Sequence, residues 1–157
     1  MTLAYVGLGA NLGDSAATLR SVAAELGATP GIAGVRLSPF YRSAPVEASG
    51  PDFVNAVAAL DTTLEPLALL DVLQALELAH GRERPYRNAP RTLDLDLLLV
   101  EGVTLEHPRL VLPHPRMHQR AFVLRPLRDL APGLALAQGR LDALIDAITD
   151  QPIERLA

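Results

Sequence analysis

The chain has 157 residues, 49% hydrophobic and 20% charged, with a formal net charge of −4, which is the length of one domain. The acidic balance argues against a nucleic-acid or membrane-surface protein. No apolar run approaches the ~20 residues of a membrane span, the N-terminus lacks a signal-peptide pattern, and the absence of cysteine excludes disulfides and thiol nucleophiles. We therefore expect a single cytoplasmic domain over residues 1–157, monomeric, without nucleic-acid or membrane partners.

Apolar periodicity divides the chain into short strands and longer helices. Capping residues mark the helix starts, and glycines mark the ends of the first two helices. In chain order, the expected elements are a strand at 3–8, a helix from 14 or 15 to 27, strands at 32–45 and 53–63, a helix at 64–81, a strand at 92–102, and helices at 121–132 and 141–149.

Two segments between these elements are expected to be irregular. Residues 82–91, "RERPYRNAPR", form a polar loop, and residues 105–120 are rich in proline and histidine. Pro126 is expected to break the helix at 121–132. The order β-α-β-β-α-β, with helices after the first and third strands, predicts a ferredoxin-like α+β sandwich with additional C-terminal helices.

The basic residues point to a small anionic ligand. All 14 are arginine, so a Walker A lysine and a Schiff-base lysine are both excluded. Nine of them lie between Arg82 and Arg128 against five acidic residues, which gives this stretch a net charge of +4. Because arginine forks match phosphate and carboxylate oxygens, a local cationic cluster on an acidic chain suggests such a ligand.

Asp94 and Asp96 stand in the apolar run "TLDLDLLLV". Residues two apart on a strand share one face, with Cα atoms about 6.5 Å apart. Leu93, Leu95 and Leu97 then occupy the opposite face and belong to the core. Two convergent carboxylates suit Mg²⁺, whose remaining ligands are phosphate oxygens and water. A solvated acidic strand face is the alternative, and the nearby arginines favour the metal.

A second pair of side chains suits a flat heteroaromatic ring. Phe53 and Asn55 are two apart on a predicted strand, so a phenyl face lies beside a carboxamide that can read a ring edge. Phe122 is another candidate stacking face. The glycines of "VGLGANLGD" fit a close-packed strand end and turn better than a dinucleotide site. Prolines among the three histidines at 107–118 argue against zinc and leave His114 as a phosphate or hydroxyl contact.

Four segments resemble one known family, the 6-hydroxymethyl-7,8-dihydropterin pyrophosphokinases of folate biosynthesis. They occur in unbroken order from about residue 3 to 135. The segments are "AYVGLGANLGD", "SPFYRSAPVEASGPDFVNA", "RNAPRTLDLDLL" and "LEHPRLVLPHPRMHQRAFVLRPL". The resemblance implies a ferredoxin-like core that transfers diphosphate from ATP to the pterin hydroxymethyl group and releases AMP.

The resemblance also implies roles for individual residues. Asp94 and Asp96 would hold two Mg²⁺ ions. The implied catalytic residues, which bear on the phosphates, are Arg82, Arg91, Asp94 and Asp96. The implied pterin-binding residues, with two phenyl rings sandwiching the pterin, are Ser43, Pro45, Phe53, Asn55 and Phe122. The implied ATP-binding residues are Gln74, Glu77, Arg84, Arg109, His114 and Arg120, and Arg84 would lie in a lid formed by residues 82–91.

Departures from the family pattern concern the lid more than the metal site. Asn88 and Ala89 stand where many relatives carry an aromatic residue and a glycine, so this departure implies the loss of a stacking contact in the lid. Two rival functions remain. Another ATP-dependent phosphotransferase or nucleotidyltransferase would keep the aspartate pair without needing the aromatic set. A catalytically silent ferredoxin-like module would bind nucleotide weakly and without metal.

Overall fold

The computed structural model describes residues 1–11, 13–44, 52–81 and 93–156. The elements in these ranges are β1 (Thr2–Ala10), α1 (Ser15–Gly27), β2 (Ile32–Leu37), β3 (Tyr41–Ser43), β4 (Phe53–Thr62), α2 (Pro66–Gly81), β5 (Asp94–Val100), β6 (Leu105–His107), β7 (Leu110–Leu112), a 3-10 helix (Met117–Gln119), α3 (Ala121–Leu130), β8 (Ala135–Leu136), β9 (Gly139–Arg140), α4 (Leu141–Asp146) and β10 (Ile153–Arg155).

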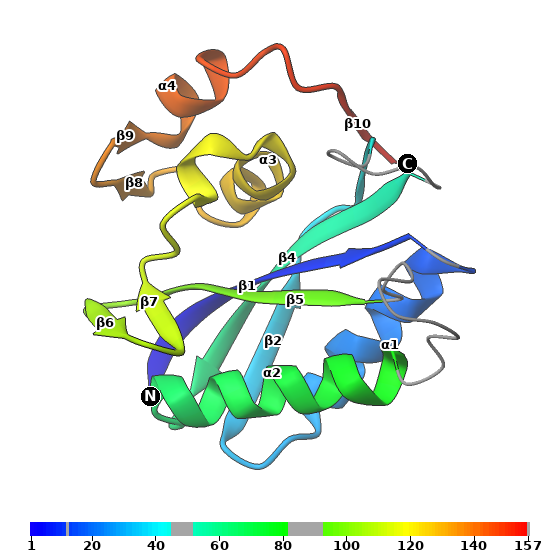
Figure 1. Cartoon of the computed structure of the whole chain (residues 1–157), viewed down its shortest axis with the longest axis vertical. Coiled ribbons are helices and arrows are strands. Elements are labelled where there is room, and N and C mark those ends of the chain that lie inside the picture. Colours follow the sequence, from blue (N-terminus) through cyan, green and yellow to red (C-terminus); the bar gives the residue numbers. More distant parts are fainter. Residues whose placement is uncertain (12, 45–51, 82–92, 157) are drawn as a thin grey trace.

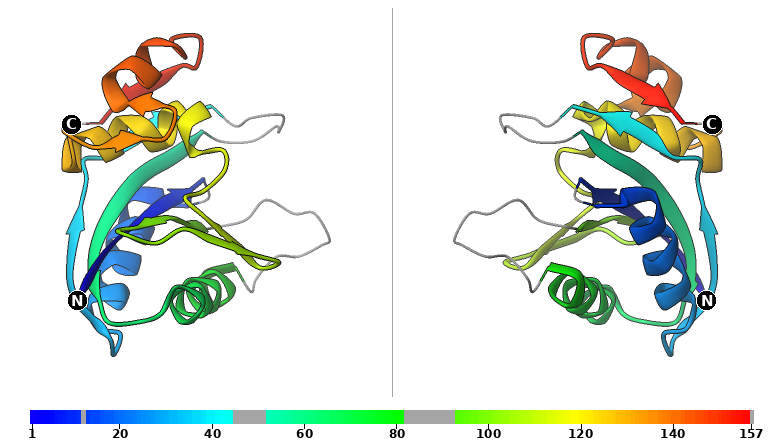
Figure 2. Two further views of the ribbon diagram at one scale, coloured as in Figure 1. Left: turned by 90° about the vertical axis from the view of Figure 1, so that its left-hand side faces the viewer. Right: turned by 90° about the vertical axis from the view of Figure 1, so that its right-hand side faces the viewer.

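An antiparallel sheet forms the centre of an α+β structure. Its strand order is β10-β3-β4-β1-β5, and β2 also pairs with β4. Helices α1 and α2 lie on one side of the sheet, and α3 and α4 lie on the other (Figure 1). The two side views in Figure 2 show the same separation, with the C-terminal segment next to α3. Among the described residues, no helix is long and apolar enough to cross a membrane.

Alternation along the strands gives the sheet two different faces. The face toward α1 and α2 is apolar along its length. It buries residues that alternate along the central strands, namely Val6, Leu8, Ala10, Ala56, Ala58, Leu60, Leu95 and Leu97. The face toward α3 and α4 has an apolar core only at one end, to which the sheet contributes Tyr5, Val57, Ala59 and Leu98. The other end of this second face carries the candidate site.

The expected strand at 32–45 is two strands. The chain leaves β2 at Ser38–Phe40 and returns to β4 as β3. Ser38 supplies hydrogen-bond partners for both backbone groups of Val57 on β4. Its backbone N–H donates to the carbonyl of Val57 (2.9 Å), and its hydroxyl accepts from the Val57 N–H (2.9 Å). Pro39 cannot donate to a strand ladder, which explains the interruption.

The predicted break at Pro126 is wrong. Helix α3 continues through this proline from Ala121 to Leu130. Val123, Leu124 and Leu127 are at most 2% exposed and pack against the sheet. This burial stabilises the helix despite the backbone hydrogen bond that proline cannot make.

The C-terminal third has more strands than the sequence predicts. Within residues 105–120, expected to be mostly irregular, β6 and β7 form a hairpin and a 3-10 helix precedes α3. Strands β8 and β9 form a second hairpin, and β10 extends the main sheet beside β3. The expected helix at 141–149 ends at Asp146.

Candidate functional site

Two glycines on β1 form the floor of the site. Gly7 lies opposite Asp96 of β5, and Gly9 lies between Asp94 of β5 and Asn55 of β4. Because neither glycine has a side chain, the sheet surface between β4 and β5 is left open here. A Cβ on Gly9 would lie only 3.2 Å from the Asn55 Oδ1 atom. Any larger residue at this position would therefore force that carboxamide to shift.

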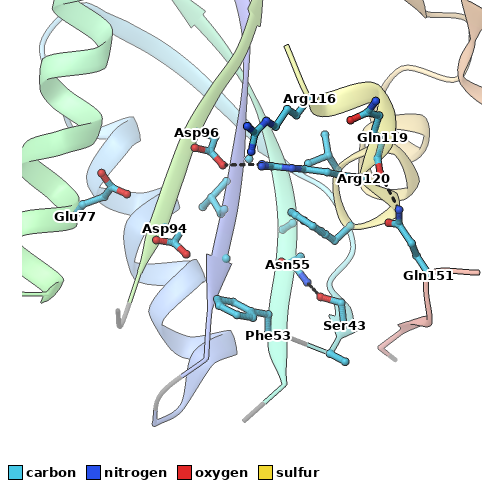
Figure 3. A pocket seen from close by; sticks show the side chains of 17 residues that line it. Ser43, Phe53, Asn55, Glu77, Asp94, Asp96, Arg116, Gln119, Arg120 and Gln151 are labelled. Atoms are coloured by element: carbon cyan, nitrogen blue, oxygen red, sulfur yellow. Dashed lines mark hydrogen bonds and ion pairs between the residues drawn. The ribbon is translucent and has the colours of Figure 1, made fainter. Parts of the chain in front are cut away.

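A cavity of about 680 Å³ opens above this floor. One wall is formed by β4 and β3, a second by β5 and α2, and a third by the segment leading into α3 (Figure 3). The lining residues are Gly7, Leu8, Gly9, Ser43, Ala44, Phe53, Asn55, Ala56, Glu77, Asp94, Asp96, Arg116, Gln119, Arg120, Phe122, Val123 and Gln151.

The aspartate pair lies as the alternation predicts. Asp94 and Asp96 are half-buried and line the cavity, whereas Leu93, Leu95 and Leu97 are at most 5% exposed in the core. The described residues contain no group of three or more His, Cys, Asp or Glu side chains arranged to hold a metal. Mg²⁺ needs only one or two protein carboxylates when phosphate oxygens complete its shell. The donor set therefore fits magnesium bound together with a phosphate.

The opposite end of the cavity combines an aromatic ring with a fixed amide. The Asn55 side chain is buried, and its Nδ2 donates a hydrogen bond to the Ser43 hydroxyl at 2.6 Å. Phe53 lies two residues before Asn55 on the same face of β4. The hydrogen bond fixes the orientation of the carboxamide, so this end can read the edge of a flat ring.

Arginines reach the cavity from the segment before α3. The Arg120 Nη1 atom lies 3.9 Å from the Asp96 Oδ2 atom, a long ion pair, and its guanidinium lies 5.6 Å from the centroid of the Phe122 ring. Arg116 projects toward Asp96 from the same side (Figure 3). Two cations beside the carboxylates suit the oxygens of a phosphate chain.

His114 lies outside the cavity lining. Its backbone N–H donates to the carbonyl of Leu98 (2.7 Å), and its ring Nδ1 accepts from the backbone N–H of Arg116 (3.1 Å). Burial lowers the pKa of His114, and the charges of Arg120 and Arg116 lower it further against the opposing charge of Asp96. The imidazole is therefore neutral near pH 7.

The residues expected to bind the nucleotide lie in two separate places. The Glu77 Oε2 atom accepts a hydrogen bond from the backbone N–H of Leu95 (2.9 Å), and Glu77 lines the cavity. Gln74 and Arg109 lie outside the lining. The Arg109 Nη2 atom, in the turn between β6 and β7, donates to Asp71 Oδ1 (2.6 Å) and to Gln74 Oε1 (3.1 Å) of α2, so these three residues form a separate group.

Several expected site residues lie outside the described residues. These are Pro45, Arg82, Arg84 and Arg91, together with the proposed lid at 82–91. Of the others, the structure brings eight to the cavity, namely Ser43, Phe53, Asn55, Glu77, Asp94, Asp96, Arg120 and Phe122.

Sequence reasoning missed several lining residues. The glycine pattern predicts a packed strand end at Gly7 and Gly9, although their alternation with apolar residues is also the signal of an open floor. Arg116 stands out in the sequence only as a member of the arginine cluster. Gln119 and Gln151 carry no signal in the sequence, because a lone glutamine has no distinctive spacing.

The fold and the site together define a class: an α+β protein whose cavity pairs carboxylates and arginines at one end with a ring-binding surface at the other. Comparison with known proteins specifies the family. The model of the 7,8-dihydro-6-hydroxymethylpterin-pyrophosphokinase (HPPK) family matches residues 5–132. The chain belongs to this family.

Individual relatives agree with this assignment. The chain is 50% identical over 154 residues to the 2-amino-4-hydroxy-6-hydroxymethyldihydropteridine pyrophosphokinase of Pseudomonas aeruginosa, covering 97% of this chain and 95% of that protein. It is 43% identical over 157 residues to the protein of the same name from Methylorubrum extorquens, covering 99% of each.

A solved structure shows the same fold. Plasmodium falciparum HPPK-DHPS with pteroate matches with a TM-score of 0.74 at 13% identity, over 95% of this chain and 42% of that one. The chain thus spans less than half the length of this larger protein.

Proposed function

We propose that this enzyme transfers diphosphate from ATP to 6-hydroxymethyl-7,8-dihydropterin and forms AMP and the pterin diphosphate in folate biosynthesis. Family membership supports the reaction. The observation that carries the assignment to this site is the arrangement of one cavity with Asp94 and Asp96 at one end and Phe53 and Asn55 at the other. A phosphate chain and a ring can therefore meet above the glycine floor.

The pterin binds at the Asn55 end in this proposal. Phe53 and Phe122 stack on the two faces of the ring, and Asn55 reads its polar edge with its carboxamide held by Ser43. Pro45, outside the described residues, is assigned to the same subsite. The buried hydrogen bond supports this role, because a carboxamide fixed before binding loses little freedom when the ring arrives.

ATP binds at the aspartate end. Asp94 and Asp96 would hold two Mg²⁺ ions, which neutralise charge on the phosphate oxygens and polarise the β-phosphorus when bound. Arg120 contacts the phosphates from the α3 side. The other residues assigned to ATP or to the transfer are Gln74, Glu77, Arg82, Arg84, Arg91, Arg109 and His114.

The chain contributes mainly position and charge to this reaction. The pterin hydroxyl oxygen attacks the β-phosphorus of ATP and its proton passes to water, while the bond from this phosphorus to the oxygen of the α-phosphate breaks and AMP leaves with the electrons of that bond. Phe53 and Asn55 hold the hydroxyl toward the phosphates, and the arginines stabilise negative charge that develops on phosphate oxygens. A loop that closes over the cavity would exclude water, the role assigned to residues 82–91.

Four further assignments accompany the function. We assign the fold to the ferredoxin-like class, supported by the order β5-β1-β4-β2 with α1 and α2 on one face. Residues 1–157 form a single domain, since relatives match over nearly the whole chain. A monomeric state and a cytoplasmic location complete the proposal.

The test is to incubate the protein with ATP, Mg²⁺ and the pterin and to measure AMP. We expect pterin-dependent AMP from the wild type and a loss of roughly 10³-fold or more in Asp96→Ala, because the magnesium ions that would neutralise the phosphates lose a protein ligand. Asp146→Ala, on an exposed position of α4, is the matched control and keeps wild-type activity. Formation of ADP in place of AMP would identify a simple kinase and overturn the proposal.

A further inference from the structure

Gln151 links the C-terminal segment to the start of α3 at the rim of the cavity. Its Nε2 donates a hydrogen bond to the backbone carbonyl of Gln119 at 2.7 Å, and its Oε1 accepts one from the backbone N–H of Ala121 at 2.9 Å. The two bonded residues flank Arg120. One side chain therefore holds the backbone on both sides of this arginine; Figure 3 shows the contact with Gln119.

The first turn of α3 depends on this contact. The first backbone N–H groups of a helix have no partner within the helix. A Ser, Thr, Asp or Asn at the N-cap commonly supplies an acceptor, but the N-cap here is Arg120, whose side chain makes no capping bond. Gln151, thirty residues farther along the chain, supplies the acceptor for Ala121 instead.

Gln151 is itself held against the other wall of the cavity. Strand β10 begins two residues later and pairs with β3, with Ile153 opposite Ser43. The backbone N–H of Leu156 adds a hydrogen bond to the carbonyl of Phe40 at 2.8 Å. The C-terminal segment thus joins the wall that carries Ser43 to the wall that carries Arg120.

The far end of α3 has its own attachment. The hydroxyl of Tyr41 on β3 donates a hydrogen bond to the carboxylate of Asp129. Val123, Leu124 and Leu127 bury the middle of the helix. Loss of the Gln151 contacts would therefore release the first turn of α3 and leave the rest of the helix in place.

We propose that Gln151 is a positioning residue that sets the direction in which Arg120 and Phe122 enter the cavity. The inference rests on the proposed function, in which Phe122 stacks on the pterin and Arg120 contacts phosphate. Both side chains come from the turn that Gln151 holds, and the Arg120 guanidinium lies over the Phe122 ring. Gln151 lies beyond the stretch that matches the family model, residues 5–132.

The first experiment compares Gln151→Ala with Gln138→Ala in steady-state assays of AMP formation. Gln138 is exposed in the turn between β8 and β9, so the same substitution there controls for loss of a glutamine in this region. We expect the KM for the pterin to rise about tenfold in Gln151→Ala, the size of a lost cap, and to stay at the wild-type value in Gln138→Ala. An unchanged KM in Gln151→Ala, with or without a lower melting temperature, would overturn the inference.

A double-mutant cycle with Phe122→Ala tests whether Gln151 acts through the ring. If it does, adding Gln151→Ala to Phe122→Ala changes the pterin KM by less than about twofold, because the ring to be positioned is gone. If Gln151 contacts the pterin itself, the tenfold effect persists in the Phe122→Ala background. That result would replace positioning by direct binding and overturn the proposal.

A substrate-free measurement separates this inference from the proposed function. Amide hydrogen exchange at Ala121 is expected to accelerate in Gln151→Ala and to stay slow in Gln138→Ala, since only the former removes the acceptor. A wild type that forms no pterin-dependent AMP would refute the function whatever the exchange rates. Slow exchange at Ala121 in Gln151→Ala, in a protein that is active, would refute the inference alone.

Discussion

The two faces of the central sheet are formed by the same strands, but one is an apolar core along its whole length and the other also carries the cavity. Toward α1 and α2, the strands present an unbroken series of buried apolar side chains. Toward α3, the apolar core stops after residues such as Val57 and Leu98, and the next positions along the strands are Gly7, Asn55 and Asp96. On this face, a step of two residues along a strand thus separates the apolar core from the cavity.

This difference shows how a small domain can keep stability and ligand binding apart. Burial of apolar side chains on the first face stabilises the sheet without involving the cavity. The second face can then carry carboxylates and side-chain-free positions that contribute little to the core. On each strand, a substitution on the first face should therefore change mainly the free energy of unfolding, and one in the cavity should change mainly the pterin KM.

The largest expected effect comes from a matched pair on β4. Leu60 is fully buried on the face toward α1 and α2, so Leu60→Ala should lower the free energy of unfolding by about 2–5 kcal/mol. Phe53 is partly exposed in the cavity, so Phe53→Ala should cost less stability but raise the pterin KM more than tenfold, because a stacking face is lost. Urea denaturation and steady-state kinetics measure the two effects. Equal changes in the pterin KM for both variants would contradict the separation.

A smaller effect is expected from the two floor glycines. In Gly9→Ala the new Cβ would lie 3.2 Å from the Asn55 Oδ1 atom, so the carboxamide must move and loosen its bond to Ser43. In Gly7→Ala the Cβ would meet the Leu98 side chain at 3.5 Å, an ordinary contact. We expect the pterin KM to rise about three- to tenfold in Gly9→Ala and less in Gly7→Ala.

The comparison between the glycine variants has a clear alternative outcome. If both variants raise the pterin KM equally, the loss of space above the glycines weakens pterin binding more than the displacement of Asn55 does. Melting temperatures within a few degrees of the wild type are required for either interpretation.

Local pattern was enough to predict which way four side chains on β4 and β5 point. Alternation places Asp94 and Asp96 on the side away from Leu95, and the structure confirms this arrangement. The same reasoning found Phe53 and Asn55, because side-chain direction on a strand follows from sequence spacing alone. The helix predicted at 64–81 from apolar residues at helical spacing is observed as Pro66–Gly81.

The parts that escaped prediction depend on contacts between distant segments. Gln151 gains its role only because β10 pairs with β3, a pairing that three residues of sequence do not indicate. Pro126 lies inside a helix because neighbouring side chains are buried against the sheet, which outweighs its local preference. In both cases tertiary packing decides the structure, and periodicity carries no information about it.

The smallest expected effect is a pH dependence from His114. Burial, aided by Arg120 and Arg116, holds the pKa of His114 below its ordinary value in the folded protein. As the pH falls below about 6.5, the unfolded chain takes up a proton at this histidine before the folded chain does. The free energy of unfolding should therefore be highest above pH 6.5 and fall until the pH passes the lower folded pKa.

Two asparagine variants test this dependence in urea titrations at several pH values. His114→Asn should remove part of the acid destabilisation, because no group at this position then takes up a proton. His107 provides the control, since its Nδ1 accepts the backbone N–H of Arg109 at 3.1 Å in the same His-Pro-Arg pattern. If the free energy of unfolding depends on pH identically in the wild type and in His114→Asn, protonation of this histidine does not destabilise the folded state and the prediction is wrong.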